Sequence, residues 1–251
     1  MEQQKKIQQL VCGMAEALLR YGAEISRVEE TMQRVAAHFQ VEQLEIFVIT
    51  NGLFVNMCQG DYHSRMKLKF VASVTVNLKK LCDINELSRN IEEKHLSLDQ
   101  ALKRLEQIQR AKDEPVREQV LASALGAAAF CFLFGGSLRD CLAAGICGFV
   151  LWMLVMAVEK KKLGLSKVLL NILGGVLVTV LCVALVRLGV ARNLDRAIMG
   201  AVIPLIPGVA FTNGIRDIVD GDYLSGSIRL LDALLIFCCI AVGVGIGLKL
   251  A

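Results

Sequence analysis

The residues best suited to chemistry in this chain follow a break in an apolar stretch that runs from Ile203 to Asp222. Pro204 and Pro207 each remove a backbone N–H donor, and Gly208 loosens the same turn. The freed carbonyl groups then need internal partners or water, and a broken apolar span of this kind typically lines a cavity. We therefore predict that the break forms part of a path for a solute.

Polar residues come directly after the break, and they are expensive at membrane depth, which makes them functional candidates: Thr212, Asn213, Arg216 and Asp217. A guanidinium such as that of Arg216 can hold a carboxylate through two N–H donors, whereas Lys offers a point charge. Asp217 could pair with Arg216 or bind an ammonium group or proton, but adjacent residues on an intact helix diverge by about 100°. We predict that Asn213, Arg216 and Asp217 bind or gate substrate. The alternative is a helix end whose charges simply reach water.

A second charged group lies near the N-terminus, where Glu24, Arg27, Glu29 and Glu30 fall within two helical turns. Side chains three or four residues apart can meet on a helix, so these residues form either solvated pairs or a docking surface. We predict that Glu24, Arg27 and Glu29 dock or gate another part of the protein.

The elements that position these residues belong to two parts of the chain, which differ in composition and meet near Glu118. Residues 1–117 carry 17 Lys/Arg and 16 Asp/Glu, whereas residues 118–251 carry 11 and 8, so the second part is apolar enough for a membrane. Five apolar runs in it approach the roughly 20 residues needed to cross a bilayer. The predicted fold is an α+β cytoplasmic domain (1–117) followed by an all-α five-span transmembrane bundle (118–251), with spans at about 120–137, 141–158, 168–186, 197–215 and 230–248.

Helical patterns and caps organise the first part. Apolar residues recur at helical spacing over residues 7–19 and again over 25–39, and Gly22 between them is suited to end the first helix. Asn77 is a suitable N-cap for a third helix, and Ser97-Leu-Asp-Gln100 is a capping box that opens a fourth.

Strand patterns lie between the second and third helices. Residues 45–57 predict a β-hairpin whose turn is Asn51-Gly52, a pair typical of type I′ turns because both residues need positive φ. The run 65–70 alternates polar with apolar residues, which predicts a third strand with Met66, Leu68 and Phe70 on one face and a solvated basic face opposite.

Charge between the runs predicts the topology. Four lysines lie in the segment 159–167, which assigns that loop to the cytoplasm. Counting spans then places the N-terminal domain in the cytoplasm and Ala251 outside. Arg187, Arg192 and Arg196 in the next loop would face outward and oppose this assignment.

Several function classes are disfavoured. The net charge of +4 is spread along the chain and does not indicate nucleic acid, and the nine cysteines and three histidines show no metal-site spacing. Gly243-x-Gly-x-Gly247 lies inside an apolar run without a preceding strand, unlike a nucleotide-binding loop. Hydrolase and Walker motifs are missing from the sequence. We expect no enzyme activity, cofactor, metal or nucleic-acid partner.

Five motifs spread over nearly the whole chain resemble the threonine/serine exporter family, and the first and last are the most specific: Gly22-Ala-Glu-Ile-Ser-Arg-Val-Glu-Glu-Thr31, Thr50-Asn-Gly52, Phe134-Gly-Gly-Ser137, Ile206-Pro-Gly208 and Arg216-Asp-x-x-x-Gly-Asp-Tyr-x-x-Gly226. The resemblance implies a multi-pass transporter of the bacterial plasma membrane. Fused members of the family have about twice as many spans, so this chain resembles the longer subunit of a split two-component form.

The resemblance also implies a partner and a substrate class. The partner would be a small membrane protein with about half of the spans. The exported metabolite would be threonine or serine, or a succinate-like dicarboxylate, because split pairs are linked to succinate export. Without a nucleotide-binding loop, uphill transport needs an ion gradient or a partner. An odd number of spans is also typical of one half of an inverted repeat. Whether copies of the chain form homo-oligomers is left open.

The alternative is a membrane-anchored sensor or scaffold with a ligand-binding cytoplasmic domain. Such a protein would not need a doubly broken span with polar residues after it. An enzyme in the N-terminal domain is the weaker rival. Flux from proteoliposomes, with and without the small partner, distinguishes these functions.

Overall fold

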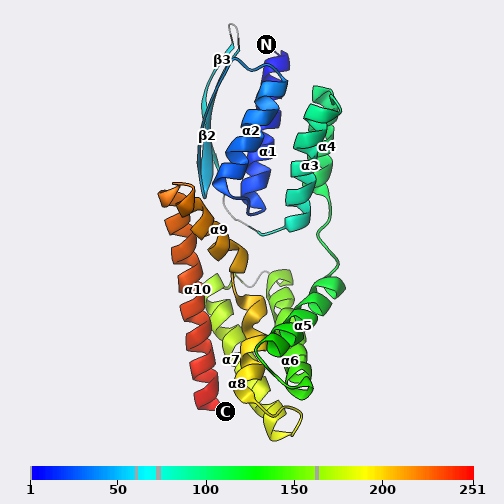
Figure 1. Cartoon of the computed structure of the whole chain (residues 1–251), viewed down its shortest axis with the longest axis vertical. Helices are drawn as coiled ribbons and strands as arrows, with labels where there is room; N and C mark the ends of the chain where they lie inside the picture. The colour runs from blue at the N-terminus through cyan, green and yellow to red at the C-terminus, as the bar shows by residue number, and fades with distance from the viewer. Residues whose placement is uncertain (1, 60–61, 72–74, 162–163) are drawn as a thin grey trace. The chain divides into compact units, whose positions relative to one another are not determined.

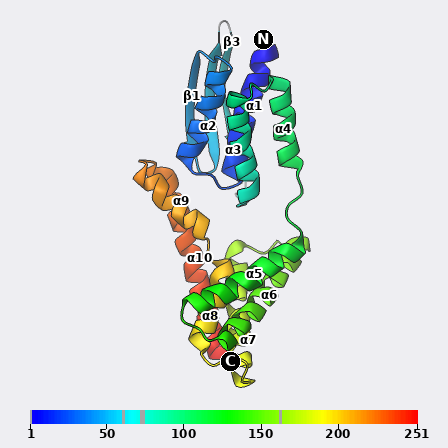
Figure 2. The ribbon, with the colours of Figure 1, turned by 45° about the vertical axis from the view of Figure 1, so that its right-hand side comes forward.

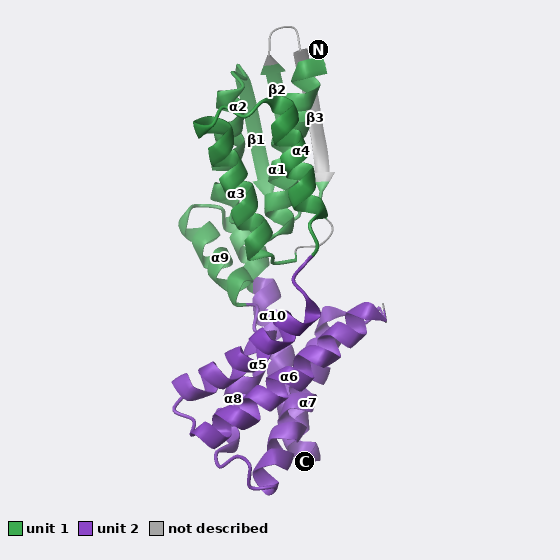
Figure 3. Ribbon diagram, turned by 90° about the vertical axis from the view of Figure 1, so that its right-hand side faces the viewer, with its two compact units in different colours: residues 1–112, 208–230 green, residues 113–207, 231–251 purple. Residues whose placement is uncertain are grey.

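A computed structural model describes residues 2–59, 62–71, 75–161 and 164–251, with side chains given outside residues 59–69. Within these ranges the chain forms ten α-helices, one short 3-10 helix and one three-stranded sheet (Figure 1). It divides into two compact units, coloured in Figure 3. The first unit contains residues 1–112 and 208–230, and the second contains residues 113–207 and 231–251.

The core of the first unit is built on the predicted helical hairpin of α1 (Glu2–Arg20) and α2 (Ile25–His38). Their apolar stripes supply most of its largest fully buried side chains, among them Leu10, Met14 and Met32. Gly22 ends α1 with φ +87, as predicted. The N–H of Gly22 bonds to the carbonyl of Leu19 and that of Ala23 to the carbonyl of Leu18, the pattern of a Schellman C-cap.

The sheet consists of β1 (Gln43–Ile49), β2 (Gly52–Gln59) and β3 (Tyr62–Phe70), antiparallel in that order. The three strands agree with the sequence, but the type I′ turn at Asn51-Gly52 is wrong. Gly52 already belongs to β2, where it pairs with Ile49, and neither it nor Asn51 has positive φ. The side chains from Arg65 to Lys69, whose faces were predicted, lie outside the described residues.

Two further helices complete the layers of this unit. They are α3 (Leu78–Glu93), capped by Asn77, and α4 (Leu98–Arg110), opened by the capping box at Ser97, both as predicted. In Figures 1 and 2, α1 and α2 form a middle layer between the sheet and the pair α3–α4. His38 and His95, far apart in the sequence, stack here with ring centroids 5.7 Å apart.

The last part of the first unit comes from much later in the chain. It contains α9 (Gly208–Val219) and the start of α10 (Tyr223–Leu250), joined at Gly221, which has φ +96. These two helices approach closely because Gly214 faces Gly226. A Cβ on Gly226 would lie 2.7 Å from the carbonyl oxygen of Gly214 and 2.6 Å from Ile218 Cγ1, so any larger residue would push the helices apart.

All the regular secondary structure among the described residues of the second unit is helical. The unit contains α5 (Val116–Leu133), α6 (Leu138–Lys160), α7 (Lys167–Arg187), α8 (Leu194–Val202), the 3-10 helix η1 (Ile203–Leu205) and the rest of α10. Small residues let these helices approach, as expected for helices that pack in lipid. A Cβ on Gly200 of α8 would lie 2.5 Å from Cys131 Cβ and 2.7 Å from the carbonyl oxygen of Ala127, both on α5.

Asp140 joins two loops of the second unit. It completes a capping box with Ser137 at the start of α6 and is fully buried. Its Oδ1 accepts the backbone N–H groups of Arg192 and Asn193 at 2.7 and 2.8 Å, and its Oδ2 accepts Asn193 Nδ2 at 3.1 Å. The buried carboxylate is therefore satisfied by several donors at once.

The predicted fold class, an α+β domain followed by a five-span bundle, is wrong. Helices dominate the described residues, and residues 208–230 belong with the N-terminal unit instead of with the spans. In the part of the chain that the structure describes, four helices are long and apolar enough to cross a membrane: α5, α6, α7 and α10. The predicted run 197–215 is a sharply bent pair, Leu194–Leu205 and Gly208–Val219, and it makes a fifth span only if the pair is counted as one.

Candidate functional site

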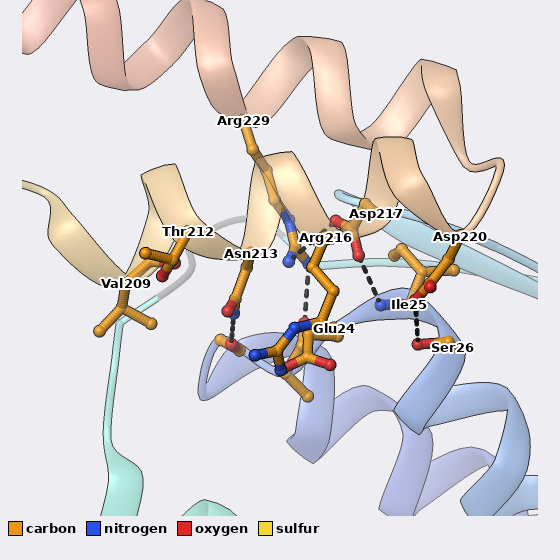
Figure 4. A network of polar contacts seen from close by, with 12 residues as sticks. Glu24, Ile25, Ser26, Val209, Thr212, Asn213, Arg216, Asp217, Asp220 and Arg229 are labelled. Atoms are coloured by element: carbon orange, nitrogen blue, oxygen red, sulfur yellow. Dashed lines mark hydrogen bonds and ion pairs between the residues drawn. The ribbon is translucent and has the colours of Figure 1, made fainter.

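The candidate site is a polar cluster between the α1–α2 turn and the α9–α10 hairpin, all within the first unit (Figure 4). The first side contributes the residues from Gly22 to Ser26. The second contributes five side chains: Asn213, Arg216, Asp217, Asp220 and Arg229. We call this set of residues the clasp.

Three contacts in the clasp bind the backbone of the turn. Asn213 Nδ2 donates to the carbonyl of Gly22 at 2.8 Å, and Arg229 Nη2 donates to the carbonyl of Ala23 at 2.8 Å. The N–H of Ile25 donates to Asp217 Oδ1 at 3.1 Å. Gly22 ends α1 with a positive φ, which glycine adopts readily. The chain turns there, and the backbone groups that follow α1 come within reach of α9 and α10.

The N-terminus of α2 is capped from α9. Glu24 occupies the N-cap position, but its side chain makes no capping hydrogen bond. Asp217 accepts the first N–H of the helix instead, and Ser26 Oγ donates to Asp220 Oδ2 at 3.0 Å. Carboxylates favour this position because the N–H groups there lack helical partners and carry the positive end of the helix dipole.

Asp217 and Arg229 form a buried ion pair. Arg229 Nη1 lies 3.1 Å from Asp217 Oδ2, and the side chains are 7% and 0% exposed. The contact is an ion pair without an aligned hydrogen bond, since Asp217 Oδ2 has no hydrogen-bonding partner within the described residues. Removing either charge would leave the other buried without its counterion, a change that costs about 3–5 kcal/mol.

Arg216 pairs with Glu24 and not with its neighbour Asp217. Successive side chains on the intact helix α9 point in different directions, so each finds its own partner on the α1–α2 turn or α10. The Arg216 side chain is 57% exposed and that of Glu24 13% exposed. This pair therefore lies on the outer side of the clasp.

The structure separates the other predicted residues from the clasp. Thr212 bonds back to its own helix, its Oγ1 donating to the carbonyl of Gly208 at 2.9 Å. Pro204 lies in η1, Pro207 follows it and Gly208 begins α9, so these three residues mark the break itself.

Two predicted residues of α2, Arg27 and Glu29, lie beside the clasp on the same helix. Arg27 is exposed, and Glu29 is half-buried. Burial raises the pKa of the Glu29 carboxyl above its usual value, and the nearby charge of Asp222 raises it further.

Sequence reasoning missed four contributors to this region: Arg229, Asp220, Ser26 and Thr50. Arg229 stands just before an apolar run and has the pattern of an interfacial anchor, so its burial had no local signal. Thr50 Oγ1 donates to the carbonyl of Ser225 at 3.3 Å, which brings the β1–β2 turn against α10. Asp220 and Ser26 are short polar residues whose pairing depends on the tertiary fold alone.

Comparison with known proteins gives one family. The chain matches the family model described as "Putative threonine/serine exporter" over residues 9–251. It is similar to the "Probable threonine/serine exporter" of Mycobacterium tuberculosis, with 22% identity over 247 residues, which cover 98% of this chain and 46% of that protein. It is also similar to the "Threonine/serine exporter" of Corynebacterium glutamicum, with 22% identity over 254 residues, 98% of this chain and 51% of that protein. No solved structure matches the chain.

The chain thus spans about half the length of the curated relatives it matches. The four helices of membrane-spanning length among its described residues, together with the family match, make it a multi-pass membrane protein. Because the match covers nearly every residue, including both sides of the clasp, the chain belongs to the threonine/serine exporter family.

Proposed function

We propose that the chain forms one half of a secondary transporter that exports small carboxylate-bearing metabolites across the bacterial plasma membrane. The curated relatives are named as threonine/serine exporters, and this chain corresponds to about half of each of them. The observation that carries the proposal is the clasp, in which α9, the helix after the broken span, is bound through its polar residues to the α1–α2 turn.

In this proposal the break and the polar residues after it belong to the substrate path. Pro204, Pro207 and Gly208 leave backbone carbonyl groups available where a continuous helix would use them. Asn213, Arg216 and Asp217 follow on α9, and Arg216 is the residue best suited to a carboxylate. The exposed fraction of the Arg216 side chain, 57%, supports this role, because a solute can reach the guanidinium.

The clasp gives the N-terminal unit a gating role in this transporter. Asp217 is at once the cap of α2 and the counterion of Arg229, so a movement of α9 would break both contacts together. Glu24 adds the outer ion pair, while Arg27 and Glu29 lie on the adjoining surface of α2. Two discrete arrangements of such a network, closed and open, are what a gate requires.

A second membrane half completes the transporter in this proposal. Half-length coverage of the relatives supports a partner, either a small separate membrane protein or a further segment of a longer chain. Two halves related as inverted repeats would form the substrate site between them, and an ion gradient would drive export. The lysines at 160, 161 and 167 support a cytoplasmic N-terminal unit.

Flux from proteoliposomes tests the proposal. Vesicles loaded with labelled serine, threonine or succinate would carry this chain, its second half, or both. We expect flux with both halves, dependence on an imposed ion gradient, and loss of flux when the clasp is broken by Asp217→Ala. Equal flux from the intact protein and the Asp217→Ala variant, at equal insertion, would contradict the gating role, and absence of flux for all three solutes would contradict the export of these metabolites.

A further inference from the structure

The ion pair between Glu24 and Arg216 differs from the other charged pair of the clasp in its exposure. Asp217 and Arg229 are almost fully buried, whereas more than half of the Arg216 side chain is exposed. The Glu24 side chain is only 13% exposed, so solvent reaches this pair from the Arg216 side, where water and salt compete for the guanidinium. The outer pair can therefore open while the inner pair stays closed.

The Glu24 side chain also takes no part in capping α2. Its carboxylate stands at the N-cap but does not cap the helix, because Asp217 accepts the first N–H. Releasing Glu24 from Arg216 leaves that cap and the bond between Ser26 and Asp220 in place. The Glu24 carboxylate thus binds the Arg216 guanidinium, and another carboxylate can bind there in its place (Figure 4).

The charges around the pair restrict which carboxylate fits. The segments 22–29 and 213–229 carry five Asp and Glu residues against three Arg, so the region is acidic overall. A dianion would bind Arg216 against this excess of negative charge. A zwitterion adds no net charge and presents an ammonium group that an acidic surface attracts.

Resting on the proposed function, we propose that a zwitterionic α-amino acid inserts between Glu24 and Arg216 and opens this outer pair. Its carboxylate takes the place of Glu24 on the Arg216 guanidinium, and its ammonium group binds the freed Glu24 carboxylate. Glu24 therefore has two roles: it is the internal competitor of the ligand carboxylate and the acceptor for the ligand ammonium group. The pair is a ligand-operated latch on the clasp.

Equilibrium binding to the full chain in lipid nanodiscs tests this latch. The probes are labelled L-serine and 3-hydroxypropionate, which is serine without its ammonium group. We expect Glu24→Gln to weaken serine binding about tenfold, because one charged contact is lost, and to strengthen 3-hydroxypropionate binding, because the competitor is gone. Arg216→Gln should weaken both. Glu30→Gln, which removes another exposed Glu–Arg pair on α2, is the matched control and should change neither.

Opposite shifts for the two probes cannot arise from a purely structural effect of Glu24. If Glu24→Gln weakened both probes equally, or changed neither, the latch would be overturned, as it would be if the intact chain bound no serine. Because binding is measured without flux, a chain that binds as expected but does not transport together with its second half would contradict the proposed function and leave the latch standing. Flux from both halves without the opposite shifts would contradict the latch and leave the proposed function standing.

Discussion

Asp217 caps a helix that begins 192 residues earlier in the chain, by accepting the N–H of Ile25 at 3.1 Å. The same carboxylate lies 3.1 Å from the guanidinium of Arg229. One side chain thus fixes the start of α2 and neutralises a buried cation. Because Asp217 makes both contacts, the stability of the first unit depends on α9, although α9 lies far from α1 and α2 in the sequence.

The first prediction follows from these two contacts of Asp217. Asp217→Ala should destabilise the first unit by about 3 kcal/mol, because it leaves Arg229 buried without a counterion and α2 without its cap. Asp217→Ala combined with Arg229→Met should recover part of this loss, since no unpaired charge remains. Thermal unfolding of the purified chain measures both effects. Equal destabilisation in the single and double variants would assign the whole effect to the cap.

Gly22→Ala should destabilise the same unit by roughly 1–2 kcal/mol, because Gly22 has φ +87 and alanine is strained there. The added Cβ would also lie 3.2 Å from Val76 Cγ2. Gly164→Ala is a partial control, since Gly164 also has positive φ, at +62, but its Cβ would meet nothing within 4 Å. A smaller loss in Gly164→Ala than in Gly22→Ala would separate the steric effect from the conformational one.

The stability of the first unit should depend on pH through Glu29. Burial raises the pKa of this carboxyl in the folded state above the ordinary value of 4.5. The contribution of Glu29 to stability is therefore fully present below about pH 4.5 and is lost as the pH rises through the folded-state pKa. Glu29→Gln should remove this part of the pH dependence, as measured by thermal unfolding across that range. An unchanged profile in Glu29→Gln would show that Glu29 does not titrate in this way.

Helix packing in the second unit gives a matched pair of glycine variants. Gly200→Ala should weaken the packing of α8 on α5, because the new Cβ would lie 2.5 Å from Cys131 Cβ and 2.7 Å from a backbone oxygen. Gly126→Ala on α5 should be nearly silent, because nothing lies within 4 Å of its added Cβ. Yield and thermal stability in detergent should fall in the first variant alone. Equal behaviour of the two would contradict this close approach.

The sequence predicted correctly those features that depend on neighbouring residues alone, such as helix ends and caps. Gly22 as a helix end and the capping box at Ser97 depend on residues within one or two turns, and the structure has both. The Asn51-Gly52 turn was wrong because contacts from outside the hairpin act on it. The backbone carbonyl of Asn51 accepts the N–H of Val71 at 2.7 Å, and Thr50 Oγ1 donates to the carbonyl of Ser225.

The prediction of the fold class was also wrong for a physical reason. An apolar run of span length predicts burial but not the surface against which it is buried. The run that ends with Ile215 looked like one span, yet α9 belongs with the N-terminal unit, where Gly214 lies against Gly226. The pairing of Asp217 with Arg229 could not be predicted either, because it depends on this arrangement of α9 and α10.

The last prediction concerns Arg216, whose guanidinium is the most exposed charge of the clasp that a solute carboxylate could bind. Arg216→Lys should reduce export by roughly tenfold or more, because Lys keeps the positive charge but loses the two-donor geometry that binds a carboxylate. If Arg216 only anchored a helix end at the membrane surface, Lys would replace it well, since that role needs only a positive head group.

The measurement is flux from proteoliposomes that contain both halves of the transporter, with insertion and assembly checked for each variant. Arg20→Lys is the matched control, because Arg20 forms an exposed ion pair with Glu16 on α1 and lies outside the clasp. We expect near-normal export from Arg20→Lys and a severe loss from Arg216→Lys. Near-normal export from both would leave Arg216 as an anchor and remove it from the substrate path, since a bidentate carboxylate contact cannot survive replacement by a single ammonium group unchanged.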